Sequence, residues 1–188
     1  MVQVAAAVVD NPLSQIVAQC RDQPLVFDGV RPDLCPALEQ IILGRMQSDR
    51  GGRKVGSLNV GGWKSGEDFF SWPDAAVQEL RQVFIEIIGG GGRAQVGWTM
   101  VNRTGSHHPR HQHRAAILVG VYYVAAGNPD AITPTVFECP CDGRPKRQEL
   151  EVEPHPGRLV ISRGETWHWV PVYPGELPRI TIAFDVRR

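Results

Sequence analysis

Residues 107–124 read HHPRHQHRAAILVGVYYV, and this stretch joins four of the six histidines of the chain to an apolar run. The run, residues 115–125, is short and rich in Val, Ile and Tyr, which predicts a buried β-strand. His111 and His113 are two residues apart just ahead of it. Because side chains alternate along an extended segment, the two imidazoles point to the same side and could chelate one metal ion.

A third histidine strengthens this interpretation. His168 lies in the segment GETWHWVPV, at the start of a late predicted strand. A close pair of histidines and a distant one could meet on neighbouring strands of a β-barrel and supply three ligands to one ion. Neutral imidazole suits Fe, Cu, Zn and Ni, so the pattern predicts a metal site without naming its metal. His107 and His108, in contrast, are expected to be loop residues.

The last strong strand, RITIAFDV, begins with a charged residue. Alternation puts Arg179, Thr181 and Ala183 on one face of this strand and its Ile and Phe side chains on the other. An arginine inside a sheet is costly unless it meets an anion. Since a guanidinium matches a carboxylate in a two-pronged hydrogen bond, the strand predicts a site for a carboxylate-bearing small molecule between Arg179 and the metal.

The rest of the chain predicts helices followed by strands. A helical period runs through residues 33–47 and 73–88, and the glycines of 89–92 end the second helix. Beyond residues 115–125, strands are expected at 94–102, 134–139, 148–153, 157–162, 168–173 and 179–186, with residues 48–72 irregular. This order predicts a mainly β fold, a sandwich or barrel, with flanking helices.

The length of 188 residues predicts one domain, 1–188. Residues 1–92 are expected to form a helical and irregular part that packs on the barrel, and residues 93–188 to form the core with the metal site. The spacing of the four cysteines does not give the two close pairs that are typical of a zinc site. All four are expected to be free reduced thiols: Cys20, Cys35, Cys139 and Cys141.

Charge and hydropathy exclude some classes of partner. Lys plus Arg number 20 and Asp plus Glu number 20, so no charge excess favours nucleic acid or an anionic membrane surface. The apolar segment VAAAVV, residues 4–9, is too short for a signal-peptide core or a membrane span. We therefore expect a cytoplasmic protein.

Taken together, these residues resemble the Fe(II)/2-oxoglutarate-dependent oxygenases, which share the double-stranded β-helix, a cupin-like jelly roll. More narrowly, the chain is similar to a small oxygenase group with an H-x-H motif. The resemblance is carried, in order, by NVGGW at 59–63, WTMVNRTG at 98–105, HQH at 111–113, GVYY at 120–123, His168 and RITIAF at 179–184.

The resemblance implies a role for each of these residues. His111, His113 and His168 would hold Fe(II), although the wider superfamily has a carboxylate where this chain has His113, so three neutral imidazoles would leave the site more positive. Arg179 and Thr181 would bind the distal carboxylate of 2-oxoglutarate, helped by Tyr123. The substrate pocket would be lined by Asn102 and Trp98 and covered by Trp63.

The implied activity is hydroxylation of a small molecule, such as an amino acid or a natural-product intermediate, with oxidative decarboxylation of 2-oxoglutarate to succinate. The expected partners are 2-oxoglutarate, dioxygen and that substrate. The short frame leaves little chain for a large lid, which favours a small substrate or an open site for a flexible one. Exposed sheet edges make a homodimer a further expectation.

Two alternatives remain open at this stage. A glycine before H-x-H and a Pro-Gly before a single histidine also resemble cupins, which could use three histidines as a dioxygenase or isomerase without 2-oxoglutarate. The glutamate usual in cupins is absent, since residues 114–118 read RAAIL, and Arg179 would have no role. The other alternative is a binding module that holds a metal without consuming dioxygen.

Overall fold

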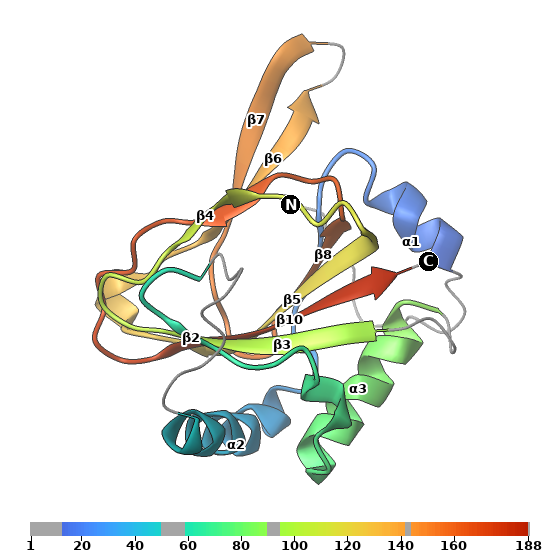
Figure 1. Cartoon of the computed structure of the whole chain (residues 1–188). Coiled ribbons are helices and arrows are strands. Elements are labelled where there is room, and N and C mark those ends of the chain that lie inside the picture. The colour runs from blue at the N-terminus through green and yellow to red at the C-terminus, as the bar shows by residue number, and fades with distance from the viewer. Residues whose placement is uncertain (1–12, 50–58, 90–94, 142–143, 188) are drawn as a thin grey trace.

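A computed structural model describes residues 13–49, 59–89, 95–141 and 144–187 of the chain. Two antiparallel β-sheets face each other, and helices flank one of them (Figure 1). This is the predicted jelly roll, mainly β with flanking helices. Among the described helices, none is long and apolar enough to cross a membrane.

The larger sheet has six strands in the order β1-β8-β5-β10-β3-β2. Their bounds, in the same order, are Leu25–Phe27, Leu159–Arg163, Ala116–Ala126, Arg179–Arg187, Gln95–Asn102 and Trp63–Lys64. The smaller sheet has the order β4-β9-β6-β7, with bounds His108–His111, His168–Val170, Thr135–Cys141 and Arg144–Val152. The α-helices are α1 (Leu13–Gln19), α2 (Cys35–Ser48) and α3 (Ala75–Ile87), and short 3-10 turns cover Pro32–Leu34, Phe69–Ser71 and Pro129–Ala131.

The seven predicted strands and two predicted helices are all present, with their ends displaced by a few residues. The sequence did not predict α1, β1, β2 or β4, which have at most seven residues each and too few side chains to show a period. The segment predicted to be irregular, 48–72, contains β2 and a 3-10 turn where it is described. Residues 4–9 lie outside the described residues.

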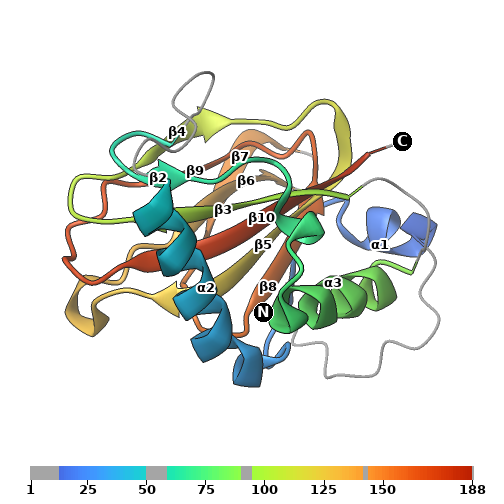
Figure 2. The same cartoon turned by 60° about the horizontal axis from the view of Figure 1, so that its bottom comes forward.

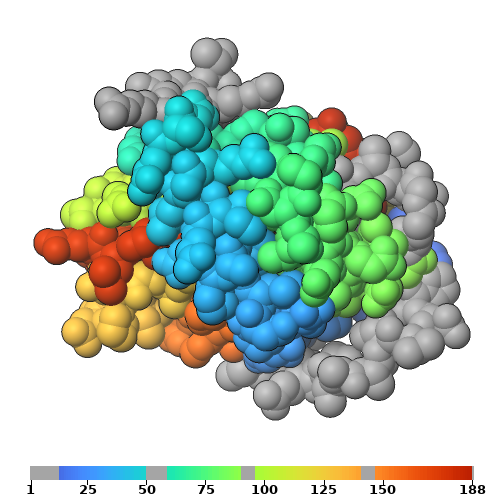
Figure 3. Space-filling view, turned by 90° about the horizontal axis from the view of Figure 1, so that it is seen from below, coloured from blue at the N-terminus to red at the C-terminus, as the bar shows by residue number. Residues whose placement is uncertain are grey.

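The helices α2 and α3 form because each has one apolar face. Leu38 and Ile42 are buried on α2, and Val77, Leu80 and Phe84 on α3, at spacings of three or four residues. These faces pack on the outer side of the six-stranded sheet, which the two helices cover (Figures 2 and 3). As predicted, glycine ends α3: Gly89 has a φ of 68°, in the left-handed region.

An aromatic layer joins these helices to the sheet. The ring of Phe84 on α3 stacks on Phe184 of β10, with centroids 4.8 Å apart, and meets Tyr122 of β5 edge-on at 5.5 Å. Phe184 lies directly over Gly120, its partner on the neighbouring strand. A Cβ added to Gly120 would lie 2.1 Å from the Phe184 ring, so only glycine leaves room for this packing.

The strand β10 has the alternation that the sequence predicted. Ile180, Ile182 and Phe184 are buried in the core beneath the helices. Arg179, Thr181 and Ala183 face the opposite way and line a pocket between the two sheets. The same strand therefore helps build both the core and the candidate site.

Two of the cysteines, Cys20 and Cys35, are free thiols, as predicted. Both are buried, as is Cys139. Burial raises the pKa of the Cys20 thiol to about 11, so it stays protonated at neutral pH.

Gly120→Ala is expected to lower the free energy of unfolding by roughly 1–3 kcal/mol, because the added methyl group collides with the buried Phe184 ring. Urea unfolding followed by circular dichroism measures the change. The control is Gly44→Ala on the exposed side of α2, where an added Cβ meets nothing within 4 Å; it should leave stability equal or higher. Equal effects of the two substitutions would contradict this account of the aromatic layer.

Candidate metal centre and pocket

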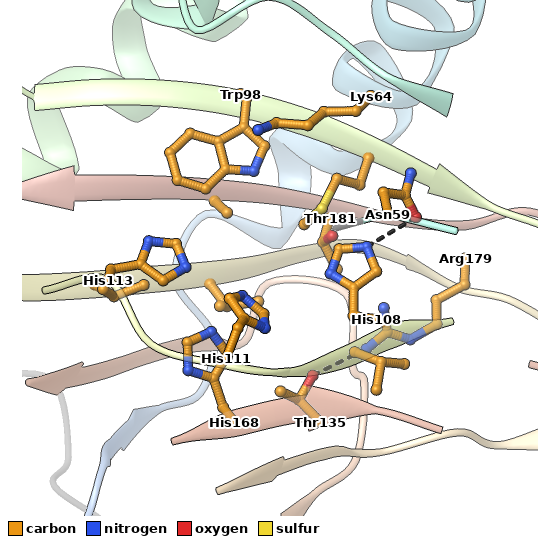
Figure 4. A pocket seen from close by; sticks show the side chains of 15 residues that line it. Asn59, Lys64, Trp98, His108, His111, His113, Thr135, His168, Arg179 and Thr181 are labelled. Carbon is orange, nitrogen blue, oxygen red and sulfur yellow. Dashed lines mark hydrogen bonds between the residues drawn. The ribbon is translucent and has the colours of Figure 1, made fainter. Parts of the chain in front are cut away.

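A close pair of histidines and a third that is distant in sequence meet between the two sheets (Figure 4). His111 ends β4, His168 begins β9, and the two are paired across the smaller sheet. His113 follows in the loop after β4. Their ring centroids lie 4.3 to 5.2 Å apart, and the three candidate ligand nitrogens are all within 4.8 Å of one another. The three side chains are therefore close enough together that they could hold one metal ion.

Hydrogen bonds fix which nitrogen of each imidazole can bind a metal. His111 donates from Nδ1 to the carbonyl of Pro109 at 2.8 Å, and His168 donates from Nδ1 to the carbonyl of Thr166 at 3.0 Å. A carbonyl oxygen only accepts, so in both rings Nδ1 must carry the proton. Nε2 is then left with a free lone pair, which is the form that binds metal ions.

His113 has a different acceptor. Its Nδ1 lies 2.7 Å from Oδ1 of Asp185, a buried carboxylate on β10. The other side of the imidazole is covered by Trp98 of β3, whose ring is nearly parallel to it at a centroid distance of 5.7 Å. These two contacts orient the ring so that its second nitrogen meets the other two histidines.

Burial keeps two of these imidazoles neutral at physiological pH. It lowers the pKa of His111 to about 4 and the pKa of His168 to about 3, and the neighbouring histidines add to the effect. Since a metal binds the neutral form, these two ligands need lose no proton at pH 7. Three imidazole nitrogen donors fit a divalent first-row metal ion such as Fe(II).

The prediction that His108 is a loop residue is wrong. His108 begins β4, is buried, and lines the same pocket, with Nε2 2.8 Å from Oδ1 of Asn59. Strict alternation would put His108 and His111 on opposite faces, but β4 is irregular between them and both face inward. His107 lies just before the strand, consistent with its prediction.

Arg179 is almost fully buried at the other end of the pocket, with 2% of its surface exposed. Its Nη2 donates to Oγ1 of Thr135 at 3.0 Å, and its Nε to the carbonyl of Thr133 at 3.3 Å. Among the described residues, no carboxylate forms an ion pair with it. A buried cation without a counter-ion facing a cavity is a site for an anion.

The pocket has a volume of about 110 Å³ and joins the three histidines to Arg179. Two of the other predicted site residues line it, Thr181 and Trp98. Tyr123 lies behind the lining: it is fully buried, its hydroxyl donates to Oγ1 of Thr135 at 2.7 Å, and its ring lies 5.3 Å from the Arg179 guanidinium.

The structure does not bring Asn102 or Trp63 to the pocket. Asn102 is buried on β3, opposite Arg179 in the strand pairing, but is outside the lining residues. The Trp63 side chain packs against the core under the helices, and its Nε1 donates to the carbonyl of Asp49 at 3.0 Å. Trp63 pairs with Val101, a residue of the helix-covered face, so the next residue, Lys64, reaches the pocket instead.

Several lining residues were missed by the sequence analysis. Lys64 holds its ammonium 4.6 Å over the Trp98 ring, and Thr135 binds Arg179. Asn59, within the quoted NVGGW block, reaches the pocket beside His108. Asp185 could have been found, because it continues the pocket face of β10. Lys64 could not, because β2 has two residues and is too short to show a pattern.

Comparison with known proteins agrees with this geometry. Residues 96–185 match the family model described as "Putative 2OG-Fe(II) oxygenase". The chain carries a 2-oxoglutarate/Fe(II) oxygenase domain. It is therefore an oxidoreductase whose cofactors are Fe(II) and 2-oxoglutarate and which uses dioxygen and a further substrate. No curated protein matches the sequence.

Solved structures with the same fold include two prolyl hydroxylases. A prolyl-4-hydroxylase from Pseudomonas putida has 20% identity and a TM-score of 0.65, with 94% of this chain and 98% of that chain covered. One from Trichoplax adhaerens, in complex with a hypoxia-inducible-factor peptide, has 14% identity and a TM-score of 0.71, with coverages of 93% and 88%.

A third solved structure of the same fold is an epimerase from nogalamycin biosynthesis. This α-ketoglutarate-dependent epimerase, in complex with Fe³⁺, α-ketoglutarate and nogalamycin RO, has 11% identity and a TM-score of 0.67. The alignment covers 92% of this oxygenase and 82% of that chain. At these identities the likeness shows the fold alone.

The buried histidines of this oxygenase predict acid sensitivity of its metal-free form. Burial lowers the pKa of His108, like that of His168, to about 3, and that of His111 to about 4, below the ordinary 6.5. Between pH 6.5 and these lowered pKa values, the unfolded chain binds more protons than the folded protein. The free energy of unfolding should therefore fall as pH decreases from about 6.5 towards 4, by at most about 1.4 kcal/mol per pH unit for each histidine.

Urea unfolding of the chelator-treated protein at pH 7, 6 and 5 measures this loss. His108→Asn should reduce the slope, whereas His155→Gln, at an exposed position, should leave it unchanged. A free energy of unfolding that is constant over this range would contradict the assignment of neutral buried imidazoles.

Proposed function

We propose that this oxygenase hydroxylates a small molecule and couples the reaction to the oxidative decarboxylation of 2-oxoglutarate to succinate. One observation carries the proposal: three imidazoles share one cavity with a buried arginine for which the described residues supply no carboxylate partner. A dicarboxylate with a keto-acid end could satisfy both groups at once, with one end at the metal and the other at Arg179.

The three histidines hold Fe(II) in this proposal. His111, His113 and His168 each present Nε2, because Nδ1 is hydrogen-bonded to a neighbour in all three rings. When bound, Fe(II) supplies the activation of dioxygen and the oxidation of a C–H bond of the substrate. The contribution of the chain is to fix the three imidazoles in one geometry and, through burial, to keep those of His111 and His168 neutral.

The cosubstrate is held at the far end by Arg179 and Thr181. The guanidinium donates to the distal carboxylate, and the Thr181 hydroxyl lies on the same face of β10. Thr135 holds the guanidinium from behind, and Tyr123 in turn donates to Thr135, so the arginine is oriented before the anion arrives. The role of Tyr123 is thus to support Arg179.

Apolar walls separate the two polar ends. Met100, Val119, Val121 and Ala183 line the cavity with Trp98, and together they exclude water from the reacting groups. The volume of about 110 Å³ is small beside the roughly 300–1,000 Å³ of pockets that enclose drug-sized ligands. Once 2-oxoglutarate is inside, this space favours a small substrate. The pocket roles of Asn102 and Trp63 stay predictions.

The remaining proposals concern the whole chain. We propose that residues 1–188 form one domain, because α2 and α3 share a core with the strands of the larger sheet. A cytoplasmic location and a homodimer stay predictions, which fractionation of cells and light scattering would test.

The oxygenase family match favours this function over the cupin alternative. Arg179 supports the same choice, since an enzyme without 2-oxoglutarate would leave a buried cation facing its cavity with no anion to bind.

Anaerobic addition of Fe(II) and then 2-oxoglutarate to the metal-free protein tests the function. A visible charge-transfer band is expected only when both are present, followed by succinate formation when dioxygen is admitted. His111→Ala should abolish iron binding and succinate formation, since a ligand is lost. If Fe(II) binds but 2-oxoglutarate produces no band, the result would favour the cupin alternative.

Arg179→Ala should raise the KM for 2-oxoglutarate at least tenfold and leave Fe(II) affinity unchanged, because the anchor for the distal carboxylate is lost but the imidazoles remain. Steady-state succinate assays and anaerobic iron titration measure the two quantities. Arg179→Lys, which keeps the charge, should be affected less. Arg163→Ala, which removes a half-buried arginine outside the pocket lining, should have the same KM as the wild-type protein. Loss of iron binding in Arg179→Ala would show that the arginine acts on the fold.

A further inference from the structure

The carboxylate of Asp185 lies immediately behind the metal site. Asp185 is on β10, on the same face as Arg179 and Thr181, and only 6% of its surface is exposed. Its Oδ1 accepts the hydrogen bond from Nδ1 of His113 at 2.7 Å. The two residues are 72 positions apart in the sequence, so the contact exists only because the strands meet in the fold.

The three imidazoles differ in what holds their Nδ1. His111 and His168 donate to backbone carbonyls two residues earlier in the chain, which are neutral acceptors. His113 alone of the three donates to a carboxylate. The wider superfamily has a carboxylate ligand at the position of His113. In this chain the carboxylate of Asp185 lies behind the His113 imidazole instead.

We propose that Asp185 is a positioning residue that orients His113 and supplies, through its imidazole, the negative charge that three neutral ligands lack. The inference rests on the proposed function, in which His113 binds Fe(II). A carboxylate behind a ligating histidine fixes the tautomer and makes the metal-binding nitrogen more basic.

His113 depends on this contact more than the other two ligands do. It lies in the loop between β4 and β5, where its backbone N–H donates to the carbonyl of Gly164 at 2.8 Å. Asp185, in contrast, is held in the middle of the six-stranded sheet, paired with Val96 on one side and Val119 on the other. A rigid strand thus acts together with the stacked Trp98 ring to fix a ligand that lies on a loop.

The second oxygen of Asp185 leaves the carboxylate largely available to His113. Oδ2 lies 3.6 Å from Nη2 of Arg187, whose side chain is 41% exposed. That ion pair is longer and more solvated than the 2.7 Å contact with the buried imidazole. The stronger interaction of Asp185 is therefore with the candidate ligand.

Asp185→Asn tests the charge with little change of shape, because the amide oxygen can still accept from Nδ1. Anaerobic titration should show a 10- to 100-fold weaker Fe(II) affinity, on the order typical for loss of an outer-shell partner of a metal ligand. The reduction potential of the iron should also rise, because a lost negative charge disfavours Fe(III). Asp185→Glu, which keeps the charge, should recover part of the affinity.

Two controls separate this role from a structural one. Asp28→Asn removes a carboxylate that pairs with Arg158 away from the pocket, and it should leave Fe(II) affinity unchanged. In a His113→Ala background, Asp185→Asn should have no further effect on affinity, since the imidazole through which it acts is absent. Circular dichroism of each metal-free variant checks that the fold is intact.

The outcomes separate this inference from the proposed function. Failure of the wild-type protein to bind Fe(II) would overturn the proposed function itself. If it binds Fe(II) and His111→Ala does not, but Asp185→Asn keeps full affinity, only the role of Asp185 is overturned. An equal loss from Asp185→Asn with and without His113 would also overturn it, because the effect would then not pass through the imidazole.

Discussion

The alternation of side chains along β10 is the constraint on which both the core and the site depend. Ile180, Ile182 and Phe184 point into the aromatic core beneath the helices, while Arg179 and Asp185 point into the space between the sheets. A slip of one residue would exchange the two sets and bury the charges among phenylalanine rings. Because β10 lies between β3 and β5, the pairing on both sides holds this register.

The same strand gives the cavity its electrical polarity. Arg179 and Asp185 are six residues apart, which at about 3.3 Å per residue separates their Cα atoms by roughly 20 Å. The anion stands at the histidine end and the cation at the opposite end. Neither charge forms an ion pair with the other, so each acts locally. A cavity organised in this way presents different chemistry to the two ends of one bound molecule.

Part of this arrangement could be predicted from the sequence. The inward direction of Arg179 follows from alternation along β10, and the strand of residues 115–125 follows from its continuous apolar composition. His111 and His113 do converge as predicted, although His113 lies in the loop after β4 and not in an extended strand. His108 could not be predicted, since an irregularity in β4 breaks the alternation. Lys64 lies on a strand of two residues. The contact of Asp185 with His113 depends on long-range strand pairing, which local patterns do not reveal.

The position of the negative charge also bears on the binding of 2-oxoglutarate, which carries two carboxylates. Among the described residues that line the pocket, the charged side chains are Lys64 and Arg179, and both are cationic. A carboxylate in place of His113, as in the wider superfamily, would place its negative charge directly on the metal. With Asp185 behind the imidazole, that charge acts on the proposed metal ligand while the ring separates it from the cosubstrate. Three histidines backed by one buried aspartate thus place the compensating charge behind a ligand, away from the space that an anion would occupy.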